Sequence, residues 1–187
     1  MEFYSIDGIL AGQHPGIEEI FNKIIPNFDR IIEIGTHKGG LTLYLHKNKS
    51  NDCDLISYDI EASYNEVPKD YNIDFRIGDC FSKETGEEIG KLIKEPSKRV
   101  LLLCDGGHKL REFSAFSEYL KCNDVIMLHD YGDTYQSWLT YATNVGWENN
   151  YSGESYARIS TSVMINNLEK YKYEEFASIF WGSFIKK

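Results

Sequence analysis

The feature that most constrains this chain is a series of five short apolar segments that begin about 20 to 26 residues apart. Each segment has the length of a buried β-strand, and the spacing leaves room for a helix between neighbours. Such a repeat forms a parallel sheet with right-handed crossovers. We therefore predict one α/β domain over residues 1–187, with a mostly parallel twisted sheet and helices on both faces. The expected strands are Arg30–Ile34, Asp54–Tyr58, Ile73–Ile77, Arg99–Cys104 and Asp124–Leu128.

Helices are expected before, between and after these strands. Leu41, Tyr44 and Leu45 recur at helical spacing behind the glycine pair, and Pro26 and Pro96 follow two of the predicted helices as stop signals. Near the carboxyl terminus, Ile159–Ile165 alternates weakly and Leu168–Ala177 is predicted as a helix. Ile179–Ile185 is predicted as an antiparallel closing strand, with the tail of that helix as the alternative. The other predicted helices are Ile17–Ile25, Leu41–Lys47, Glu84–Lys94, Leu110–Lys121 and Thr134–Thr143.

A carboxylate stands at or near the end of every predicted strand. The carboxyl ends of parallel strands meet at one edge of a sheet, where open α/β sheets bind ligands. Five carboxylates there would repel one another without a cationic or hydrogen-bonding ligand. The alternative is that each one caps the following turn or helix, which suits any single residue but less well the full set. The residues are Glu33, Asp59, Asp79, Asp105 and Asp130.

A glycine-rich loop follows the first predicted strand and leads into a helix. Glycine permits a tight turn and a close approach of backbone to a ligand. The spacing is G-x-x-x-G-G rather than the G-x-G-x-x-G of dinucleotide-binding folds, so an oxidoreductase with a nucleotide cofactor is disfavoured. The loop sequence is Glu33-Ile34-Gly35-Thr36-His37-Lys38-Gly39-Gly40.

The segment Ile31–Gly40 resembles motif I of class I S-adenosylmethionine-dependent methyltransferases. Asp59 matches the acidic residue that these enzymes use for the ribose hydroxyls, with Glu61 as a rival. Gly78–Cys80 resembles the motif whose acidic residue lies by the adenine amino group. The resemblance implies a single-domain, Rossmann-like methyltransferase fold with S-adenosylmethionine as its cofactor. The cofactor-binding residues that it implies are Glu33, Gly35, Thr36, Gly39, Gly40, Asp59, Asp79, Cys80 and Asp105.

A narrower resemblance, over about residues 8–135, is to the cephalosporin hydroxylase and rhamnosyl O-methyltransferase group. It rests on Gly12–Pro15, the glycine loop, Asp105–His108 and His129–Tyr131, and the last two are also similar to macrocin-type small-molecule O-methyltransferases. The group often has an acidic residue where His129 stands. The resemblance implies methyl transfer to a hydroxyl of a small molecule or sugar. Methylation of an amino group, a hydroxylase-like activity and a non-catalytic S-adenosylmethionine-binding module are the alternatives.

Three parts of the domain are distinguished. Residues 1–28 are expected to form an N-terminal helical cap, and residues 29–133 the cofactor-binding core. Residues 146–158 are polar and aromatic and contain two glycines, and a loop of that length is usually functional or mobile. We interpret this loop as a lid or acceptor-binding loop, with Trp147, Tyr151 and Tyr156 offering ring faces; an ordinary surface loop is the alternative.

Asp105 and Asp130 end neighbouring predicted strands, so they are expected to face each other. Two hard oxygen ligands suit Mg²⁺ or a similar divalent cation, which would lower the pKa of a bound acceptor hydroxyl. His129 is a further candidate metal ligand. Asp105, His108 and Lys109 are the candidate catalytic residues, with His108 as general base because its ordinary pKa lies near neutral pH. A helix-start role for His108 and a surface position for Lys109 are the alternatives.

Bulk properties limit the partners. A net charge of −9 with scattered basic residues disfavours nucleic acid, because phosphate binding needs clustered Lys and Arg. The chain has no apolar run of membrane-spanning length and no secretory signal, so we expect a soluble, cytoplasmic protein. The four cysteines form no C-x-x-C pair, which favours buried free thiols. The aromatic pair Phe180–Trp181 is a candidate contact in a homo-oligomer.

Overall fold

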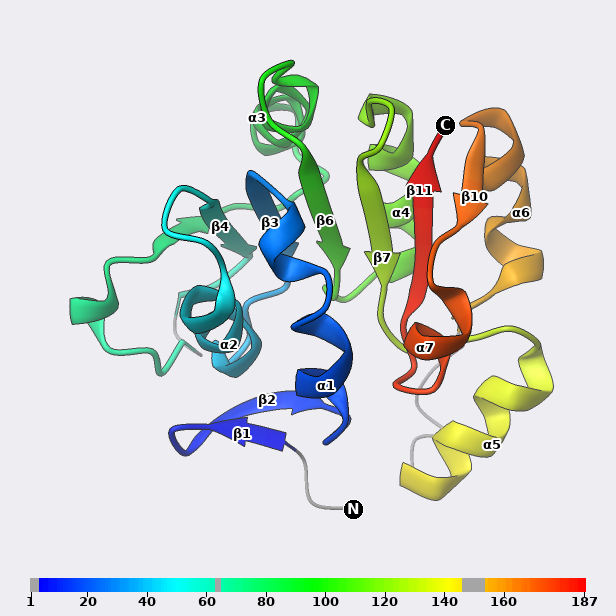
Figure 1. The fold of residues 1–187 in the computed structure, drawn as a ribbon, viewed down its shortest axis with the longest axis horizontal. Helices are drawn as coiled ribbons and strands as arrows, with labels where there is room; N and C mark the ends of the chain where they lie inside the picture. Colours follow the sequence, from blue (N-terminus) through cyan, green and yellow to red (C-terminus); the bar gives the residue numbers. More distant parts are fainter. Residues whose placement is uncertain (1–3, 63–64, 146–153) are drawn as a thin grey trace.

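A seven-stranded sheet with helices on both faces organises the chain (Figure 1). The computed structural model describes residues 4–62, 65–145 and 154–187. The strand order is β10-β11-β7-β6-β3-β4-β5, and the five strands from β7 to β5 run parallel. Their bounds are β3 Arg30–Ile34, β4 Asp54–Asp59, β5 Asp74–Ile77, β6 Val100–Cys104 and β7 Val125–Leu128. The five predicted strands are confirmed to within two residues at each end.

The apolar character of the central strands explains their position. Every residue of β6 and β7 is buried, as is expected of parallel strands covered by helices on both faces. The chain runs outward from β3 through β4 to β5 and then returns to β6 on the other side of β3. The strand order therefore reverses between β3 and β6, and the crevice beyond their carboxyl ends is where such sheets bind ligands.

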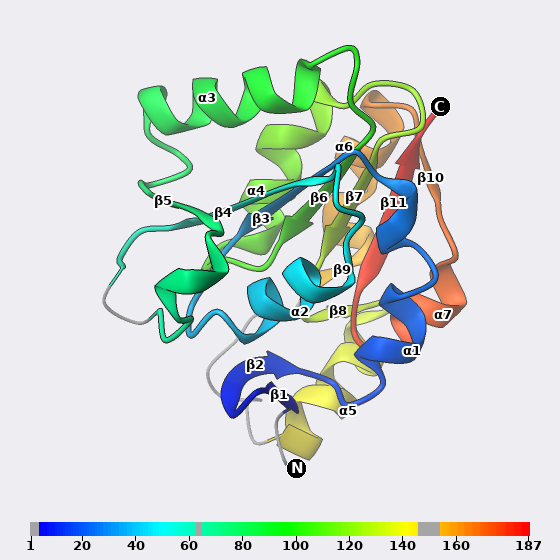
Figure 2. The ribbon, with the colours of Figure 1, turned by 60° about the vertical axis from the view of Figure 1, so that its left-hand side comes forward.

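Helices from the described part of the chain cover both faces of the sheet (Figure 2). On one face lie α1 (Ile17–Phe21), α2 (Gly40–Asn48) and α7 (Tyr173–Ala177), which bury Phe21, Tyr44 and Phe176. On the other face lie α3 (Lys83–Lys94), α4 (Lys109–Phe116) and α6 (Tyr156–Ile165), which bury Ile93, Phe113 and Ile159. Short 3₁₀ turns complete the layers at η1 (Ile25–Asn27), η2 (Lys69–Tyr71) and η3 (Ser117–Tyr119).

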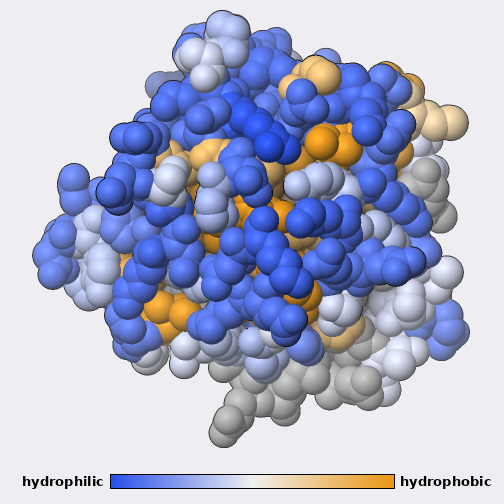
Figure 3. Space-filling view, in the orientation of Figure 1, coloured by the Kyte–Doolittle hydropathy of each residue, from blue (hydrophilic) through white to orange (hydrophobic). Residues whose placement is uncertain are grey.

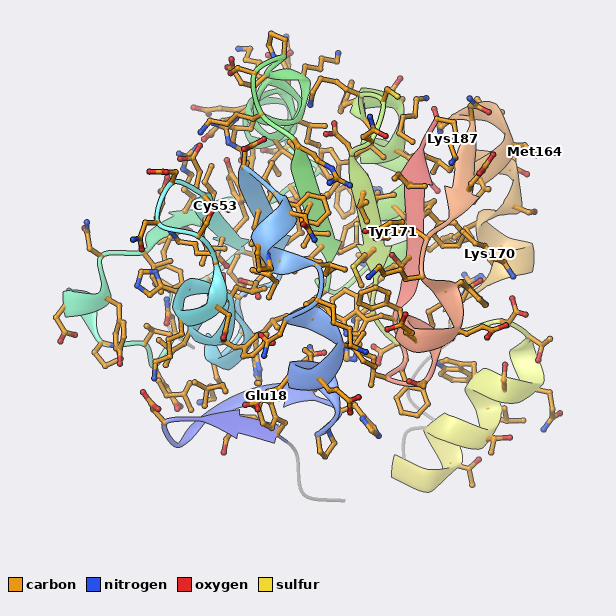
Figure 4. The ribbon with its side chains drawn as sticks, viewed as in Figure 1. Glu18, Cys53, Met164, Lys170, Tyr171 and Lys187 are labelled. Carbon is orange, nitrogen blue, oxygen red and sulfur yellow. The ribbon has the colours of Figure 1, made fainter. Side chains whose placement is uncertain are left out.

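The prediction of a helical cap over residues 1–28 is wrong for the first half of that range. A β-hairpin of β1 (Tyr4–Ile6) and β2 (Ile9–Gln13) precedes α1, and it lies at the carboxyl-end edge of the sheet in both ribbon views. Asp7 and Gly8 join the strands with φ of 49° and 81°. An Asp-Gly pair with both φ angles positive is typical of a two-residue hairpin turn, so this dipeptide was the missed signal. Tyr4 donates a hydrogen bond to Glu18 of α1, which Figure 4 labels beside the hairpin.

The carboxyl-terminal part differs from the prediction in one segment. The closing strand is confirmed as β11 (Gly182–Lys186), which pairs antiparallel with β7. The helix expected over Leu168–Ala177 is wrong in its first part, where β10 (Leu168–Lys170) pairs with β11. Lys172, with a φ of 45°, separates this strand from α7. The weakly alternating segment Ile159–Ile165 is helical and belongs to α6.

The region of the expected lid is described only in part. Helix α5 (Tyr135–Val145) follows β8 (Tyr131–Gly132), and β8 pairs with β9 (Glu154–Ser155). Residues 146–153, with the candidate ring donors Trp147 and Tyr151, lie outside the described residues. The end of the expected loop, from 154 to 158, is not a loop: it forms β9 and the first turn of α6.

The described surface is mostly hydrophilic on the face seen in Figure 3, where hydrophobic residues show in separate small areas. The four cysteines are free, as expected, but the expectation of burial is confirmed only for Cys53 and Cys104: Cys80 is partly buried and Cys122 is exposed. No helix within residues 4–62, 65–145 and 154–187 is long and apolar enough to cross a membrane. Phe180–Trp181 was predicted as a contact in a homo-oligomer. This prediction is wrong for Trp181, because its side chain is fully buried in the core.

Candidate functional site

Two adjoining cavities lie beyond the carboxyl ends of β3, β4 and β6. The first has a volume of about 410 Å³ and the second about 560 Å³. Both are lined by Gly35 after β3, Asp59 at the end of β4, and Gly106 and Gly107 after β6. The cavities therefore meet at the point where the strand order reverses.

The first cavity contains two of the carboxylates at the strand ends. Asp59 accepts hydrogen bonds from the backbone N–H of His37 at 2.7 Å and of Glu61 at 3.3 Å. Asp79 accepts from the backbone N–H of Phe81 at 2.8 Å. The two aspartates thus shape their own turns, as the capping interpretation required, and they also line the cavity. A carboxylate oxygen has more than one lone pair, so both can still accept from a ligand.

An aromatic ring forms one wall of the first cavity. Phe81 lines the cavity, and the guanidinium of Arg111 lies 3.8 Å from the centroid of its ring. The ring of His108 lies 6.4 Å from it. Cys80 also lines this cavity, and burial raises the pKa of its thiol to about 12, so the thiol stays protonated at neutral pH. His108 thus lies with the predicted cofactor residues Asp79 and Cys80, and it does not line the second cavity.

The second cavity contains a cluster of charged side chains. Asp105, Lys109, His129 and Asp130 all line it, and each side chain is at most 13% exposed. Lys109 Nζ lies 3.0 Å from Asp130 Oδ2 and 3.8 Å from Asp105 Oδ1. His129 Nδ1 lies 2.9 Å from Asp105 Oδ1. Asp130 has a φ of 56°, and in this backbone conformation its carboxylate contacts the ammonium of Lys109. The predicted approach of Asp105 and Asp130 is confirmed.

Two residues that the sequence analysis did not place in a site complete this cluster. Gln13, at the end of β2, donates from Nε2 to Asp105 Oδ2 at 2.7 Å. Trp181 donates from Nε1 to Gln13 Oε1 at 2.9 Å, and its ring stacks on His129 with centroids 4.9 Å apart. Gln13 was quoted only as part of the family resemblance, and nothing local in the sequence linked Trp181 to the site.

The electrostatics of the cluster follow from burial and from opposite charges. Burial lowers the pKa of Lys109, but the charges of Asp130 and Asp105 outweigh it and raise the pKa above its ordinary value. Burial also lowers the pKa of His129, and the same two carboxylates raise it overall. Burial raises the pKa of Asp130, while His129 and Lys109 lower it overall. His129 Nε2 and Asp130 Oδ1 are buried without a hydrogen-bond partner among the described residues.

The glycines of the loop are needed for packing within the protein. Gly35 has a φ of 101°, and a Cβ there would lie 2.4 Å from the carbonyl oxygen of Asp105. At Gly39, with a φ of 87°, a Cβ would lie 2.4 Å from Val67 Cγ2, and at Gly40 it would lie 2.5 Å from backbone atoms of β2. Gly39 and Gly40 line neither cavity, so their expected contact with a cofactor is not supported. Thr36 lines the second cavity.

Glu33 lies beneath the loop and not in a cavity. It is fully buried and accepts hydrogen bonds from Thr42 and Ser57, both at 2.5 Å. Burial raises its pKa to about 8. Ser57 in turn lies 2.6 Å from the hydroxyl of Thr36, so Glu33 braces the loop from below. Its expected direct contact with a cofactor is not supported by its position.

Glu112 of α4 is a further buried carboxylate, and the sequence analysis missed it. It accepts hydrogen bonds from the backbone N–H of Gly106 at 3.2 Å and of His108 at 3.0 Å. It also lines the first cavity, and burial raises its pKa to about 7. Glu112 therefore holds the loop that separates the two cavities.

The expected metal site does not fit the arrangement. Within the described ranges, no group of three or more His, Cys, Asp or Glu side chains is placed to hold a metal ion. The ammonium of Lys109 lies between Asp105 and Asp130, where the divalent ion was expected. Both oxygens of Asp105 are already engaged by Gln13 and His129.

Comparison with solved structures confirms the fold. No family model matches the chain, and no curated protein matches its sequence. An apo structure of CmcI gives a TM-score of 0.70 at 15% identity, over 98% of this chain and 76% of that chain. A structure of CmcI with Mg and S-adenosylmethionine gives 0.67 at 17% identity, over the same shares. Human N-acetylserotonin methyltransferase with S-adenosylmethionine gives 0.56 at 13% identity, over 92% of this chain and 51% of that chain. The chain thus has the Rossmann-like fold of class I S-adenosylmethionine-dependent methyltransferases.

Proposed function

We propose that the protein transfers the methyl group of S-adenosylmethionine to a hydroxyl of a small molecule or sugar. The observation that supports this proposal is the junction of the two cavities at Gly35 and Asp59. One cavity offers acidic and aromatic groups suited to an adenosyl moiety, and the other a polar, charged cluster suited to an acceptor. A methyl group at their junction would face both.

The first cavity fits an adenosyl group. Asp59 can accept hydrogen bonds from ribose hydroxyls, and Asp79 from an exocyclic amino group, since each keeps free lone pairs. Phe81 offers a ring face to a purine, and base–aromatic stacking of this kind is worth about 1–3 kcal/mol. The carboxylates Asp59 and Asp105, near the junction, suit a positively charged sulfonium.

The second cavity supports the chemistry of a hydroxyl acceptor. S-adenosylmethionine, when bound, supplies a methyl group on a sulfonium sulfur. The acceptor oxygen forms its bond to the methyl carbon as the carbon–sulfur bond breaks, and the electron pair of that bond stays on sulfur. Lys109, protonated at neutral pH, stabilises the negative charge that develops on the oxygen.

The hydroxyl proton needs an acceptor, and His129 suits this role better than His108. Asp105 accepts from His129 Nδ1, which fixes the ring and leaves the lone pair on Nε2. That atom is buried without a partner among the described residues, and His129 lines the second cavity. His108 lines only the first cavity, so the base role expected for it passes to His129 in this proposal.

Ligand binding tests the cofactor. A thermal-shift series with S-adenosylmethionine, its demethylated product and NAD measures which one the folded protein binds. At 100 times its dissociation constant, a ligand that binds only the folded state raises the free energy of unfolding by about 2.7 kcal/mol. Asp59→Asn should weaken this effect, whereas Asp52→Asn, in the exposed turn before β4, should not. A shift with NAD alone would overturn the assignment.

Methyl transfer tests the reaction. A panel of hydroxylated sugars and small molecules is incubated with S-adenosylmethionine labelled on its methyl group, and label in the acceptor is counted. With an acceptor in hand, His129→Asn should lower kcat by about 10²–10⁴-fold and leave binding of the demethylated product unchanged. His108→Asn is the matched control and should affect binding more than kcat. Label in an amine instead of a hydroxyl would favour N-methylation.

A further inference from the structure

Lys109 fills the position between the two carboxylates of the second cavity. Its Nζ donates to the carbonyl oxygen of Gly106 at 2.9 Å, and lies 3.0 Å from Asp130 and 3.8 Å from Asp105. A lysine ammonium has three N–H donors and no acceptor, and here it has three oxygens around it. Because its side chain is only 12% exposed, these oxygens replace most of its water.

The carboxylate of Asp105 is already engaged by donors on both oxygens. Gln13 donates to Oδ2, and His129 lies within hydrogen-bond distance of Oδ1. Trp181 fixes the Gln13 amide by donating to its oxygen, so the amide nitrogen faces Asp105. A cation such as Mg²⁺ needs about six oxygen ligands, and here N–H donors surround the carboxylate instead.

The ammonium of Lys109 offsets one of the two negative charges of the cluster without a metal. Asp105 and Asp130 bring two negative charges, Lys109 brings one positive charge, and His129 lies beside both carboxylates. The carboxylates raise the pKa of Lys109 above its ordinary value, so the ammonium persists at neutral pH. A divalent cation entering the cluster would lie against this ammonium and be repelled by it.

We propose that Lys109 is the resident cation of this site and that the site binds no divalent metal. The ammonium holds Asp105 and Asp130 together and presents a positive charge to the second cavity. The part of this inference that concerns an acceptor oxygen rests on the proposed function, and the part that concerns metal binding does not.

Binding of Mn²⁺ tests the inference directly, because its electron paramagnetic resonance signal reports free ion. The wild-type protein, titrated with Mn²⁺ and followed also by calorimetry, should show no saturable binding at the cluster. Mg²⁺ and EDTA should leave its melting temperature unchanged. Saturable Mn²⁺ binding that is lost in Asp105→Asn would overturn the inference.

Removal of the ammonium should create the missing metal site. Lys109→Ala frees Asp130 and leaves a space between the two carboxylates, so saturable Mn²⁺ binding should appear. Lys109→Gln, of similar length, should show the same gain if the alanine variant fails to fold. Lys121→Ala is the matched control, since Lys121 also pairs with a buried aspartate, at 2.7 Å from Asp124, but lines neither cavity. Absence of any gain in a folded Lys109 variant would contradict the inference.

The same samples separate this inference from the proposed function. Binding of demethylated cofactor, measured by calorimetry with and without EDTA, tests the proposed function and is expected to be independent of metal. If no cofactor binds, the proposed function fails while the Mn²⁺ result still decides the role of Lys109. If cofactor binds and wild-type protein also takes up Mn²⁺ at Asp105, only the inference fails.

Discussion

The two cavities are built in different ways, although they share residues at their junction. The first is shaped by turns that directly follow strands, where Asp79 accepts from the backbone two residues on. The second depends on contacts between distant parts of the chain. The bond between Gln13 and Asp105 spans 92 residues, and that between Gln13 and Trp181 spans 168. The first cavity therefore reflects local sequence, and the second the completed tertiary structure.

The largest expected effect comes from removing Trp181, the core side chain that contacts Gln13 and His129 of the second cavity. Trp181→Ala should lower the free energy of unfolding by about 3–5 kcal/mol, because a fully buried indole leaves a cavity. Urea denaturation measures the change. Trp181→Phe keeps most of the packing and removes only the Nε1 donor, so it should cost less. A loss below about 1 kcal/mol in the free energy of unfolding for Trp181→Ala would contradict the view that the packed indole stabilises this part of the protein.

Gly35→Ala should have the next largest effect, because it disturbs the junction of both cavities. The added Cβ would lie 2.4 Å from the carbonyl oxygen of Asp105, in a left-handed conformation that alanine disfavours. Overpacking and strain together predict a loss of about 2–4 kcal/mol in the free energy of unfolding, measured with urea. Gly107→Ala is the control, since a Cβ there meets nothing within 4 Å. Equal losses in both variants would contradict the steric argument.

A pH effect of intermediate size is expected from Glu112, whose pKa rises from 4.5 to about 7 on folding. Between these values the folded state keeps a proton that the unfolded chain has released. The free energy of unfolding therefore falls as pH rises from about 4.5 to 7, by at most about 1.4 kcal/mol per pH unit, and levels off above it. Glu33, with a pKa of about 8, acts in the same direction.

Glu112→Gln sharpens this prediction because it removes one titrating group and keeps a side-chain oxygen acceptor. Urea denaturation at several pH values from 5 to 8 gives the slope of stability against pH for wild type and variant. The slope of the variant should be shallower below pH 7. Parallel slopes would mean that Glu112 does not hold its proton in the folded state.

The smallest effect is expected at the exposed wall of the first cavity. Phe81→Ala should weaken binding of demethylated cofactor about tenfold through lost stacking, which corresponds to about 1.4 kcal/mol. Stability should change by less than about 1 kcal/mol, because the ring is only partly buried. Calorimetry and urea denaturation measure the two quantities. A loss in the free energy of unfolding equal to that of Trp181→Ala would contradict the view that the second cavity depends more on long-range packing than the first.

The same contrast explains how much of the molecule the sequence could predict. The strands were predictable because buried parallel strands are continuous apolar runs, as in Val100–Cys104. Asp59 and Asp79 were predictable for the first cavity because Asp59 ends β4 and Asp79 lies two residues past the end of β5. The sheet also brought Asp105 and Asp130 together as expected, because β6 and β7 are neighbours.

The remaining features depend on long-range packing or on turn signals that were overlooked. Gln13 reaches the site from the end of β2, which the Asp7–Gly8 turn joins to β1 in a hairpin. Lys109 was expected to be a catalytic or a surface residue, but it is buried beside two carboxylates, and its ammonium lies where the metal ion was expected. The periodicity of the sequence does not predict which lysine will be buried, because burial of a lysine depends on where its partners lie in three dimensions.

The bond between Gln13 and Trp181 has a consequence for synthesis of the protein. Among the segments that line or support the second cavity, ribosomes make the hairpin first and the Trp181 segment last. A nascent chain can pair β3 with β4 long before the indole that orients the Gln13 amide has emerged. A chain that ends before Trp181 would therefore still contain the glycine loop and its neighbouring strands. It would lack the indole that donates to Gln13 and stacks on His129 in the charged cluster.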